Sequence, residues 1–258
     1  MENKVNILTI SGHDPSGGAG LQADIESINA MGGHPLSLVS CLTTQDSCNV
    51  VSINAVDAEI LRQQAKVLLA DMLITAIKIG LIPNHEVLEV IIDICREFPS
   101  LPIVVDPVLA AGGGKNIANQ SLTEAIFQQL LPLTTVLTPN TLELQRLSGL
   151  EDFAKAVQLF ADQGCAYTLV TGTHADTSAV INQLYYQGKL LQTLSWPRLL
   201  GEYHGSGCTL ASALAALLGQ GYESQLASKK AQQFAWDSLQ AATIQGSCQH
   251  FPNRLLIK

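Results

Sequence analysis

The chain has 258 residues, of which 47% are hydrophobic and 14% are charged, and its formal net charge is -8. This composition excludes a disordered protein, because the apolar residues suffice for a large core. The acidic balance argues against nucleic acid or an anionic membrane as the main partner. The length suits one large α/β domain, and we predict a single domain over residues 1–258.

The cysteines and the hydropathy of the sequence indicate in which cellular compartment the protein is expected. No Cys-x-x-Cys pair is present, which argues against a structural zinc site. No signal peptide and no bilayer-spanning apolar stretch can be recognised. We therefore predict a cytoplasmic protein with no membrane partner, whose thiols are reduced and mostly buried. The cysteines are Cys41, Cys48, Cys95, Cys165, Cys208 and Cys248.

Short apolar runs alternate with segments of helical periodicity along the chain. Strands are predicted at residues 5–10, 36–43, 50–56, 76–79, 103–105, 135–137, 167–170, 179–186 and 190–196. Helices are predicted at residues 21–31, 58–72 with Asp57 as N-cap, 85–98, 122–131, 139–147, 153–163, 209–218 and 223–244. This alternation predicts a three-layer αβα fold with a central, mostly parallel sheet. Ligands of such sheets bind at the carboxyl ends of the strands.

Two glycine-rich segments do not match the common nucleotide-binding motifs. Residues 12–20 lack the Gly-x-Gly-x-x-Gly spacing of dinucleotide-binding loops. Residues 112–115 end in Gly-Lys but are not a Walker A loop, because Leu109 and Asn116 occupy the required glycine and hydroxyl positions. Any bound nucleotide is therefore held by a different structural element.

The strongest candidate for that nucleotide-binding element is the sequence Gly205-Ser206-Gly207-Cys208, directly before a helical segment. Small residues allow backbone amides to surround an anion at a helix N-terminus, where the dipole favours negative charge. Such a cradle stabilises a phosphoryl group during transfer. At this position we expect a lowered pKa for Cys208, which would act as a general base. The alternative is a simple packing turn containing a small buried Cys.

Carboxylates and an amide follow two other predicted strands. Asn140 and Glu143 share the first turns of a helix that Pro139 is expected to begin. Together with Asp106, Glu143 is predicted to lie near Mg²⁺ and phosphates. The alternatives are a first-turn Glu that offsets the helix dipole and an ordinary loop Asp.

Further polar groups lie near strand ends. Thr171 and Gly172 are placed to contact ATP phosphates, or they form only a strand-end turn. Asp24 and Gln45 can hydrogen-bond a flat heterocycle, although both residue types are commonly solvated. His13 and His204 lie inside motif loops, whereas the other histidines show no metal spacing.

Together these segments resemble the hydroxymethylpyrimidine/phosphomethylpyrimidine kinases of thiamine biosynthesis, which belong to the ribokinase superfamily. The resemblance covers most of the chain. It rests on residues 10–24, 78–80, 105–108, 138–140 with Glu143, and 205–209. It implies a ribokinase-like fold, a homodimer, and ATP- and Mg²⁺-dependent phosphorylation of hydroxymethylpyrimidine and then of its phosphate.

The resemblance also implies roles for individual residues. Cys208 would be the catalytic base, within an anion cradle formed by Gly205, Ser206 and Gly207. The pyrimidine pocket would comprise Gly12, Asp24, Gln45, Leu81 and Val108. ATP would contact Asn140, Thr171, Gly172, Gly205 and Gly207. Asp106 and Glu143 would adjoin the metal.

Two departures from the family pattern remove positive charge. The family usually has a Lys shortly after Asp-Pro-Val, but here residues 110–113 are Ala-Ala-Gly-Gly and Lys115 is displaced. A Lys-Gly-Gly-His segment is replaced by Thr171-Gly172-Thr173-His174.

Three other functions are open on the sequence. A pyridoxal kinase shares the fold, and a pyrimidine-binding sensor could keep the pocket without catalysis. A cysteine hydrolase built on Cys208 would need an orienting His, for which His250 is the candidate.

Overall fold

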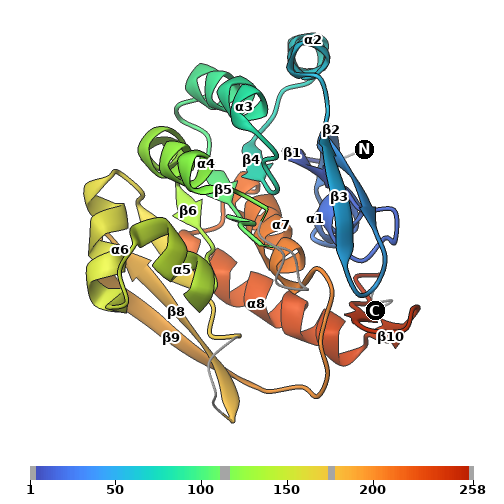
Figure 1. The fold of residues 1–258 in the computed structure, drawn as a ribbon. Coiled ribbons are helices and arrows are strands. Elements are labelled where there is room, and N and C mark those ends of the chain that lie inside the picture. The colour runs from blue at the N-terminus through green and yellow to red at the C-terminus, as the bar shows by residue number, and fades with distance from the viewer. Residues whose placement is uncertain (1–3, 111–116, 174–177, 256–258) are drawn as a thin grey trace.

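A central β-sheet organises the molecule (Figure 1). The computed structural model describes residues 4–110, 117–173 and 178–255. Within these residues nine strands pair in the order β3-β2-β1-β4-β5-β6-β7-β8-β9. Six neighbouring strands are parallel and the other three are antiparallel to their neighbours, which confirms the predicted mostly parallel sheet. The strands are β1 (Asn6–His13), β2 (His34–Gln45), β3 (Val50–Ala55), β4 (Ala76–Ile79), β5 (Ile103–Val105), β6 (Val136–Leu137), β7 (Tyr167–Val170), β8 (Ala179–Tyr186) and β9 (Lys189–Pro197).

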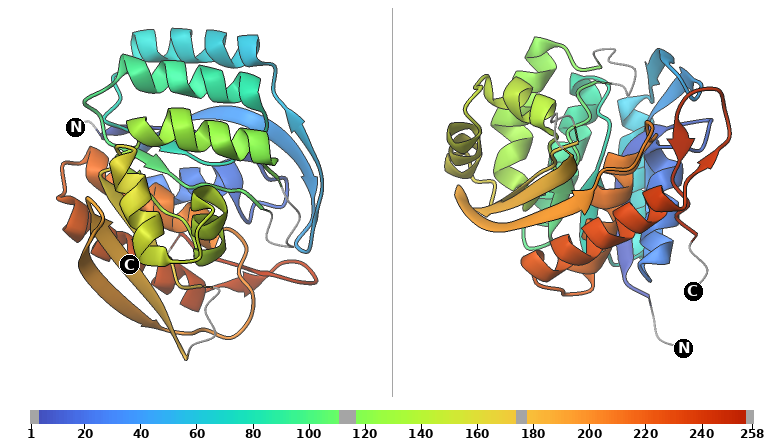
Figure 2. Two further views of the ribbon diagram at one scale, coloured as in Figure 1. Left: turned by 60° about the vertical axis from the view of Figure 1, so that its left-hand side comes forward. Right: turned by 90° about the horizontal axis from the view of Figure 1, so that it is seen from below.

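Helices cover both faces of the sheet (Figure 2). They are α1 (Gly20–Ala30), α2 (Ala58–Asp71), α3 (His85–Glu97), α4 (Gln120–Ala125), α5 (Thr141–Ser148), α6 (Phe153–Asp162), α7 (Ser206–Gly219) and α8 (Ser224–Gln240). A π-helical turn (Ile126–Leu130) and a 3-10 turn (Leu131–Leu133) extend α4. A small sheet of β10 (Thr243–Ile244) and β11 (His250–Phe251) lies near the C-terminus.

Alternation along the strands divides the core into two layers. On β1, Leu8 and Ile10 pack into the cluster beneath α2 to α6, and Ile7 packs into the cluster beneath α1, α7 and α8. All three side chains are fully buried. Successive side chains of a strand point to opposite faces, so a strand covered on both faces has a continuous apolar run. This explains why the predicted strand at residues 5–10 shows no polar alternation.

Several predicted helix boundaries are wrong, and for three of them the structure shows what sets the true boundary. Helix α7 begins at Ser206, because Gly205 has φ 77° and ends the preceding loop, so Cys208 lies within the helix and not before it. Helix α5 begins at Thr141, because the Asn140 side chain caps it. Helix α8 ends at Gln240, and residues 243–244 form β10.

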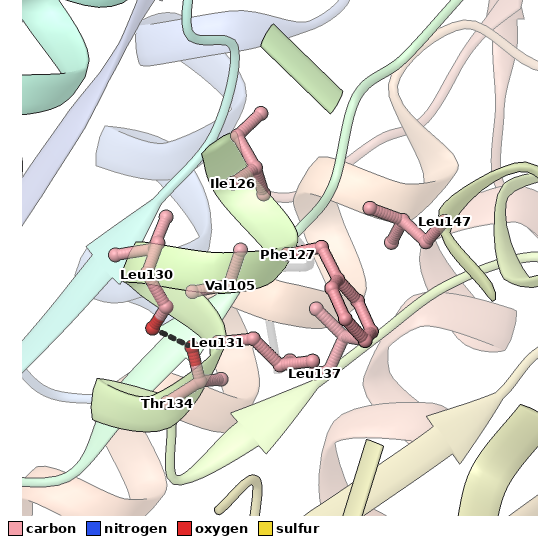
Figure 3. A pocket seen from close by; sticks show the side chains of 8 residues that line it. All are labelled: Val105, Ile126, Phe127, Leu130, Leu131, Thr134, Leu137 and Leu147. Carbon is pink, nitrogen blue, oxygen red and sulfur yellow. Dashed lines mark hydrogen bonds between the residues drawn. The ribbon is translucent and has the colours of Figure 1, made fainter. Parts of the chain in front are cut away.

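A small gap in the apolar layer lies beneath the π-helical turn (Figure 3). Its volume is about 10 Å³, and its lining is apolar apart from Thr134. The Thr134 hydroxyl donates a hydrogen bond to the Leu130 carbonyl at 2.9 Å, so its hydroxyl is already paired. A site this small with no free polar partner holds neither a ligand nor an ordered water. We interpret it as imperfect packing at the π-helical turn.

The prediction that all cysteines are reduced is wrong. Cys48, in the turn between β2 and β3, forms a disulfide with Cys248, although 200 positions separate them in sequence. No sequence spacing indicates such a long-range pair, because only the fold brings the two segments together. In the described part of the chain, no helix is both long and apolar enough to cross a membrane.

Candidate active site

A cleft of about 660 Å³ opens along the carboxyl ends of the parallel strands. The register aligns these ends, since Ile10 pairs with Ile79, Ile79 with Val105, and Val105 with Leu137. The loops that leave neighbouring strands therefore meet at one edge of the sheet. Of the predicted site residues, those lining the cleft are Gly12, Gln45, Leu81, Asp106, Val108, Asn140, Glu143, Thr171, Gly205, Ser206, Gly207 and Cys208.

Asp24 and Gly172 do not line this cleft. The Asp24 carboxylate is fully buried and accepts hydrogen bonds from Thr9, Lys78 and Ser212. It therefore has no free capacity to accept a bond from a substrate amino group, and the predicted substrate contact is wrong. The Gly172 amide donates to the Asn182 side chain at 3.1 Å, so it is likewise occupied.

Lys78 is the charged residue that the sequence interpretation missed. Its ammonium is fully buried and lies 2.8 and 3.0 Å from the two Asp24 carboxylate oxygens. Burial lowers the pKa of this ammonium, but Asp24, Cys208 and Asp106 together outweigh burial, and the net pKa lies above its ordinary value. The available signal was a lysine inside the otherwise apolar strand β4, since a buried charge requires a partner.

The predicted anion cradle is formed by the first turn of α7. Gly205 adopts the left-handed conformation as N-cap, and Ser206, Gly207 and Cys208 follow as the first helical residues. The first N–H groups of a helix have no intrahelical partner and carry its positive dipole end. All four residues border the cleft. This turn can therefore bind a phosphoryl group through main-chain N–H groups.

Two glycines of this turn allow a matched test of that inference. A Cβ at Gly205 would require a strained positive φ and would clash with the Gly18 carbonyl oxygen. We expect Gly205→Ala to lower the free energy of unfolding by about 2–4 kcal/mol. A Cβ at Gly207 would meet Asp106 at an ordinary 3.5 Å. Gly207→Ala should therefore keep its stability in urea denaturation yet lose at least about tenfold in kcat/KM, because its methyl group enters the cradle. Full activity of Gly207→Ala would contradict the placement of the phosphoryl group.

Cys208 is not the partly ionised thiol that the sequence predicts. Its side chain is half-buried at the cleft. Burial raises the pKa of Cys208 to about 12, and the Asp106 and Asp24 carboxylates oppose the lowering effect of Lys78. The neighbouring Asp106 carboxyl has a pKa of about 6, because burial raises it despite the opposing effects of Lys78 and of the nearby Cys208 thiol. Cys208 is therefore protonated in the free protein, next to a carboxylate that can accept its proton.

The carboxyl groups of Asp106 and Glu143 both border the cleft, and each is close enough for its charge to affect the other. Burial and the neighbouring Asp106 carboxylate raise the pKa of Glu143 to about 8. One Glu143 oxygen accepts the Asn140 amide at 2.9 Å and completes the capping box of α5. Within the described residues no group of three His, Cys, Asp or Glu side chains forms a complete metal site. Two repelling carboxylates suit Mg²⁺, provided that phosphate oxygens and water complete its shell.

The raised pKa of Glu143 predicts how metal binding depends on pH. A cation near this carboxyl must displace its proton at any pH below about 8. We expect Mg²⁺ affinity in the presence of ADP to rise by up to about tenfold per pH unit from pH 7 to 8 and then to level off. Isothermal titration calorimetry at several pH values measures this slope. The Glu143→Gln variant should bind Mg²⁺ more weakly and without the slope, and an unchanged slope would exclude Glu143 as its origin.

Two contacts hold the loop at residues 12–20 against α7 and the residues just before this helix. Asp14 accepts hydrogen bonds from Ser16, Ala19 and His204, the last at 2.8 Å. Burial alone would raise the pKa of Asp14, but the bonds from His204 and Ser16 outweigh it and lower the pKa.

The second contact comes from the far end of the chain. Arg254, which is 2% exposed, donates to Thr209 at 2.8 Å and to the carbonyl of Gly18. No local pattern in the sequence indicates either contact.

Two predicted features lie outside the described residues. They are the Gly112–Lys115 segment, with its displaced lysine, and His174 of the altered phosphate segment. Thr173, the neighbour of His174, borders the cleft. Of the predicted phosphate-binding groups, the backbone amides of α7 lie within the described residues.

One known protein family matches most of the chain. The model of the phosphomethylpyrimidine kinase family matches residues 14–253. The chain belongs to this family. The match covers the loop at residues 12–20 from Asp14 onward, both carboxylates and the α7 cradle, so the resemblance inferred from the sequence is confirmed.

Curated relatives of this phosphomethylpyrimidine kinase family member include enzymes of two lengths. The hydroxymethylpyrimidine/phosphomethylpyrimidine kinase of Haemophilus influenzae is 33% identical, over 91% of this chain and 90% of that protein. The chloroplastic thiamine biosynthetic bifunctional enzyme of Arabidopsis thaliana is 30% identical, over 95% of this chain and 50% of the enzyme. The chain therefore spans about half the length of the plant relative and nearly all of the bacterial one.

Solved structures confirm the ribokinase-like fold. An ADP complex of Bacillus subtilis pyridoxal kinase has a TM-score of 0.90 and 25% identity, and the match covers 98% of each chain. The phosphomethylpyrimidine kinase of Clostridium difficile has a TM-score of 0.79 and 26% identity, over 90% of this chain and 98% of that one. A pyridoxal kinase and a phosphomethylpyrimidine kinase thus share this fold.

Proposed function

We propose that this protein transfers the terminal phosphoryl group of ATP to hydroxymethylpyrimidine, and then to the resulting monophosphate. The supporting observation is that one cleft unites the α7 cradle and the Cys208–Asp106 pair with Gly12, Gln45 and neighbouring pyrimidine-pocket residues. Phosphoryl transfer depends mainly on positioning and charge stabilisation, which this arrangement supplies.

The first transfer needs a proton acceptor, because a hydroxymethyl group is a poor nucleophile. The high pKa of Cys208 excludes a standing thiolate as that acceptor. We propose instead a relay, in which the hydroxyl proton moves to the Cys208 sulfur while the thiol proton moves to Asp106. Asp106, with a pKa of about 6, is largely ionised near neutral pH and can accept it.

Binding of ATP and Mg²⁺ fits the remaining groups. Main-chain N–H groups of residues 206–208 would hold the migrating phosphoryl, and Thr171 and Asn140 border the adjoining part of the cleft. Glu143 and Asp106 both border this part of the cleft and are the candidate carboxylates for Mg²⁺. Bound Mg²⁺ would neutralise charge on the phosphate oxygens.

A coupled assay of ADP release tests this function. Hydroxymethylpyrimidine, its monophosphate and pyridoxal are compared as acceptors at matched concentrations. We expect turnover with both pyrimidines and a higher kcat/KM for hydroxymethylpyrimidine than for pyridoxal. Tight pyrimidine binding without ADP release would instead support the sensor.

Pyridoxal phosphorylation is the second candidate. It is favoured by the close structural likeness to pyridoxal kinases, including a Staphylococcus aureus enzyme in complex with pyridoxal with a TM-score of 0.89. A kcat/KM that is higher for pyridoxal than for either pyrimidine would establish it.

The homodimer stays a prediction. Leu42 and Val51 on the β2–β3 hairpin are 52% and 65% exposed, which provides apolar area for a second copy. Sedimentation analysis of the protein and of a Leu42→Ser/Val51→Ser variant would test it.

A further inference from the structure

The Cys48–Cys248 disulfide joins two segments at the rim of the cleft. Cys48 lies in the turn of the β2–β3 hairpin, and Cys248 lies between β10 and β11. We call residues 243–251 the strap. The Cα atoms of the two cysteines are 5.1 Å apart, within the range that a disulfide spans. The bond thus connects a hairpin from the first fifth of the chain to a segment near its end.

Hydrogen bonds align the two segments on either side of the bond. Ser47 accepts the Ser247 amide through its hydroxyl oxygen at 3.1 Å and the Gln249 amide through its carbonyl at 3.3 Å. In the hairpin turn, Asp46 accepts the amides of Cys48 and Asn49, both at 2.8 Å. The cysteines therefore face each other on backbone that is ordered by neighbouring contacts.

Both joined segments contribute to the acceptor side of the cleft. Gln45 and Val50, on either side of the hairpin turn, line the cleft, as does Gln249 of the strap. The carbonyl of His250, also in the strap, accepts the His204 amide at 2.9 Å. His204 in turn holds Asp14 of the loop at residues 12–20. A change in the position of the strap would therefore be transmitted to both walls of the pyrimidine pocket.

An external thiol can reach this cysteine pair, because one of its two sulfur atoms lies on an exposed residue. The Cys248 side chain is exposed and Cys48 is half-buried. Cys41, Cys95 and Cys165 are buried, and burial raises the pKa of each thiol to about 11 or 12. Exchange requires access and a thiolate, so these three thiols are poor competitors.

We propose that Cys48 and Cys248 form a reversible thiol–disulfide modification site that sets the affinity of the cleft for its acceptor substrate. The reductant is a thiol or dithiol. Its thiolate attacks the exposed Cys248 sulfur, the S–S bond breaks, and the Cys48 thiolate leaves and takes up a proton. A second reductant thiol then releases Cys248 as a thiol, so two electrons and two protons reach the protein while the reductant becomes a disulfide. The oxidised form holds the hairpin and the strap together and preorganises the pocket.

The test compares the oxidised protein with protein reduced by dithiothreitol, each state being verified by intact mass. This inference rests on the proposed function, so acceptor KM is measured with hydroxymethylpyrimidine and ATP. We expect reduction to raise acceptor KM by about threefold or more, while ATP KM and kcat change less than about twofold. The Cys48→Ser/Cys248→Ser variant should show the raised KM with or without reductant. Ser247→Ala, which keeps both cysteines and the Ser247 amide, should respond as the unaltered protein does.

Two results would overturn the proposal. One is an acceptor KM that stays the same although the mass shows complete reduction. The other is absence of the bond after air oxidation. If neither redox state phosphorylates any acceptor, the proposed function fails separately. In that case, calorimetry measures the Kd of hydroxymethylpyrimidine for the oxidised and the reduced protein. A Kd that stays the same after complete reduction would overturn the redox proposal.

Discussion

Replacing Cys208 by alanine is expected to slow phosphorylation of hydroxymethylpyrimidine by about 10²–10⁴-fold, the usual contribution of a general base. The reason is that, in the proposed relay, the hydroxyl proton reaches Asp106 through this thiol. Phosphorylation of the monophosphate should fall by less than about tenfold, because its attacking oxygen is already anionic near neutral pH. Single-turnover rates with each acceptor measure the two steps separately.

Cys208→Ser is the informative control for that experiment. A hydroxyl can accept and pass on a proton at the same position, so this variant should keep more of the first transfer than Cys208→Ala. Equal losses in both transfers for Cys208→Ala would contradict the relay and would point to a role in positioning the cradle.

Replacing Lys78 by methionine is expected to lower the free energy of unfolding by about 3–5 kcal/mol, because a buried carboxylate loses its cation. Lys78 and Asp24 are both fully buried, and Lys78 donates to both oxygens of Asp24. Asp24 would retain only hydrogen bonds from Thr9 and Ser212 among the contacts that stabilise its charge. Urea denaturation measures the loss.

The double variant Lys78→Met/Asp24→Asn separates charge from packing. It removes both charges with little change in shape, so most of the lost stability should return. A double variant as unstable as the sum of its single variants would show that the two residues act independently and would contradict the ion-pair explanation.

Local patterns were sufficient for most elements of the fold. The strand at residues 167–170 was predicted with the bounds that β7 has, and Asp57 caps α2 as expected. Both depend on neighbours within a few residues: an apolar run in one case, and a side chain bonding the next amides in the other.

Side-chain partners required the fold itself. Asp24 appeared available for a ligand because its partner Lys78 lies 54 positions away. The pKa of Cys208 was predicted from its place at a helix start, whereas burial and the Asp106 charge determine it in the folded protein. A pKa rule based on one helix end leaves out charged neighbours such as Asp106, which follows a strand elsewhere in the sheet.

The contact of Arg254 with Gly18 and Thr209 has a consequence for synthesis of the protein. A ribosome adds Arg254 to the chain 236 residues after Gly18. The loop cannot acquire this anchor while Arg254 remains inside the exit tunnel. In a nascent chain the glycine loop should therefore stay unanchored until Arg254 has emerged.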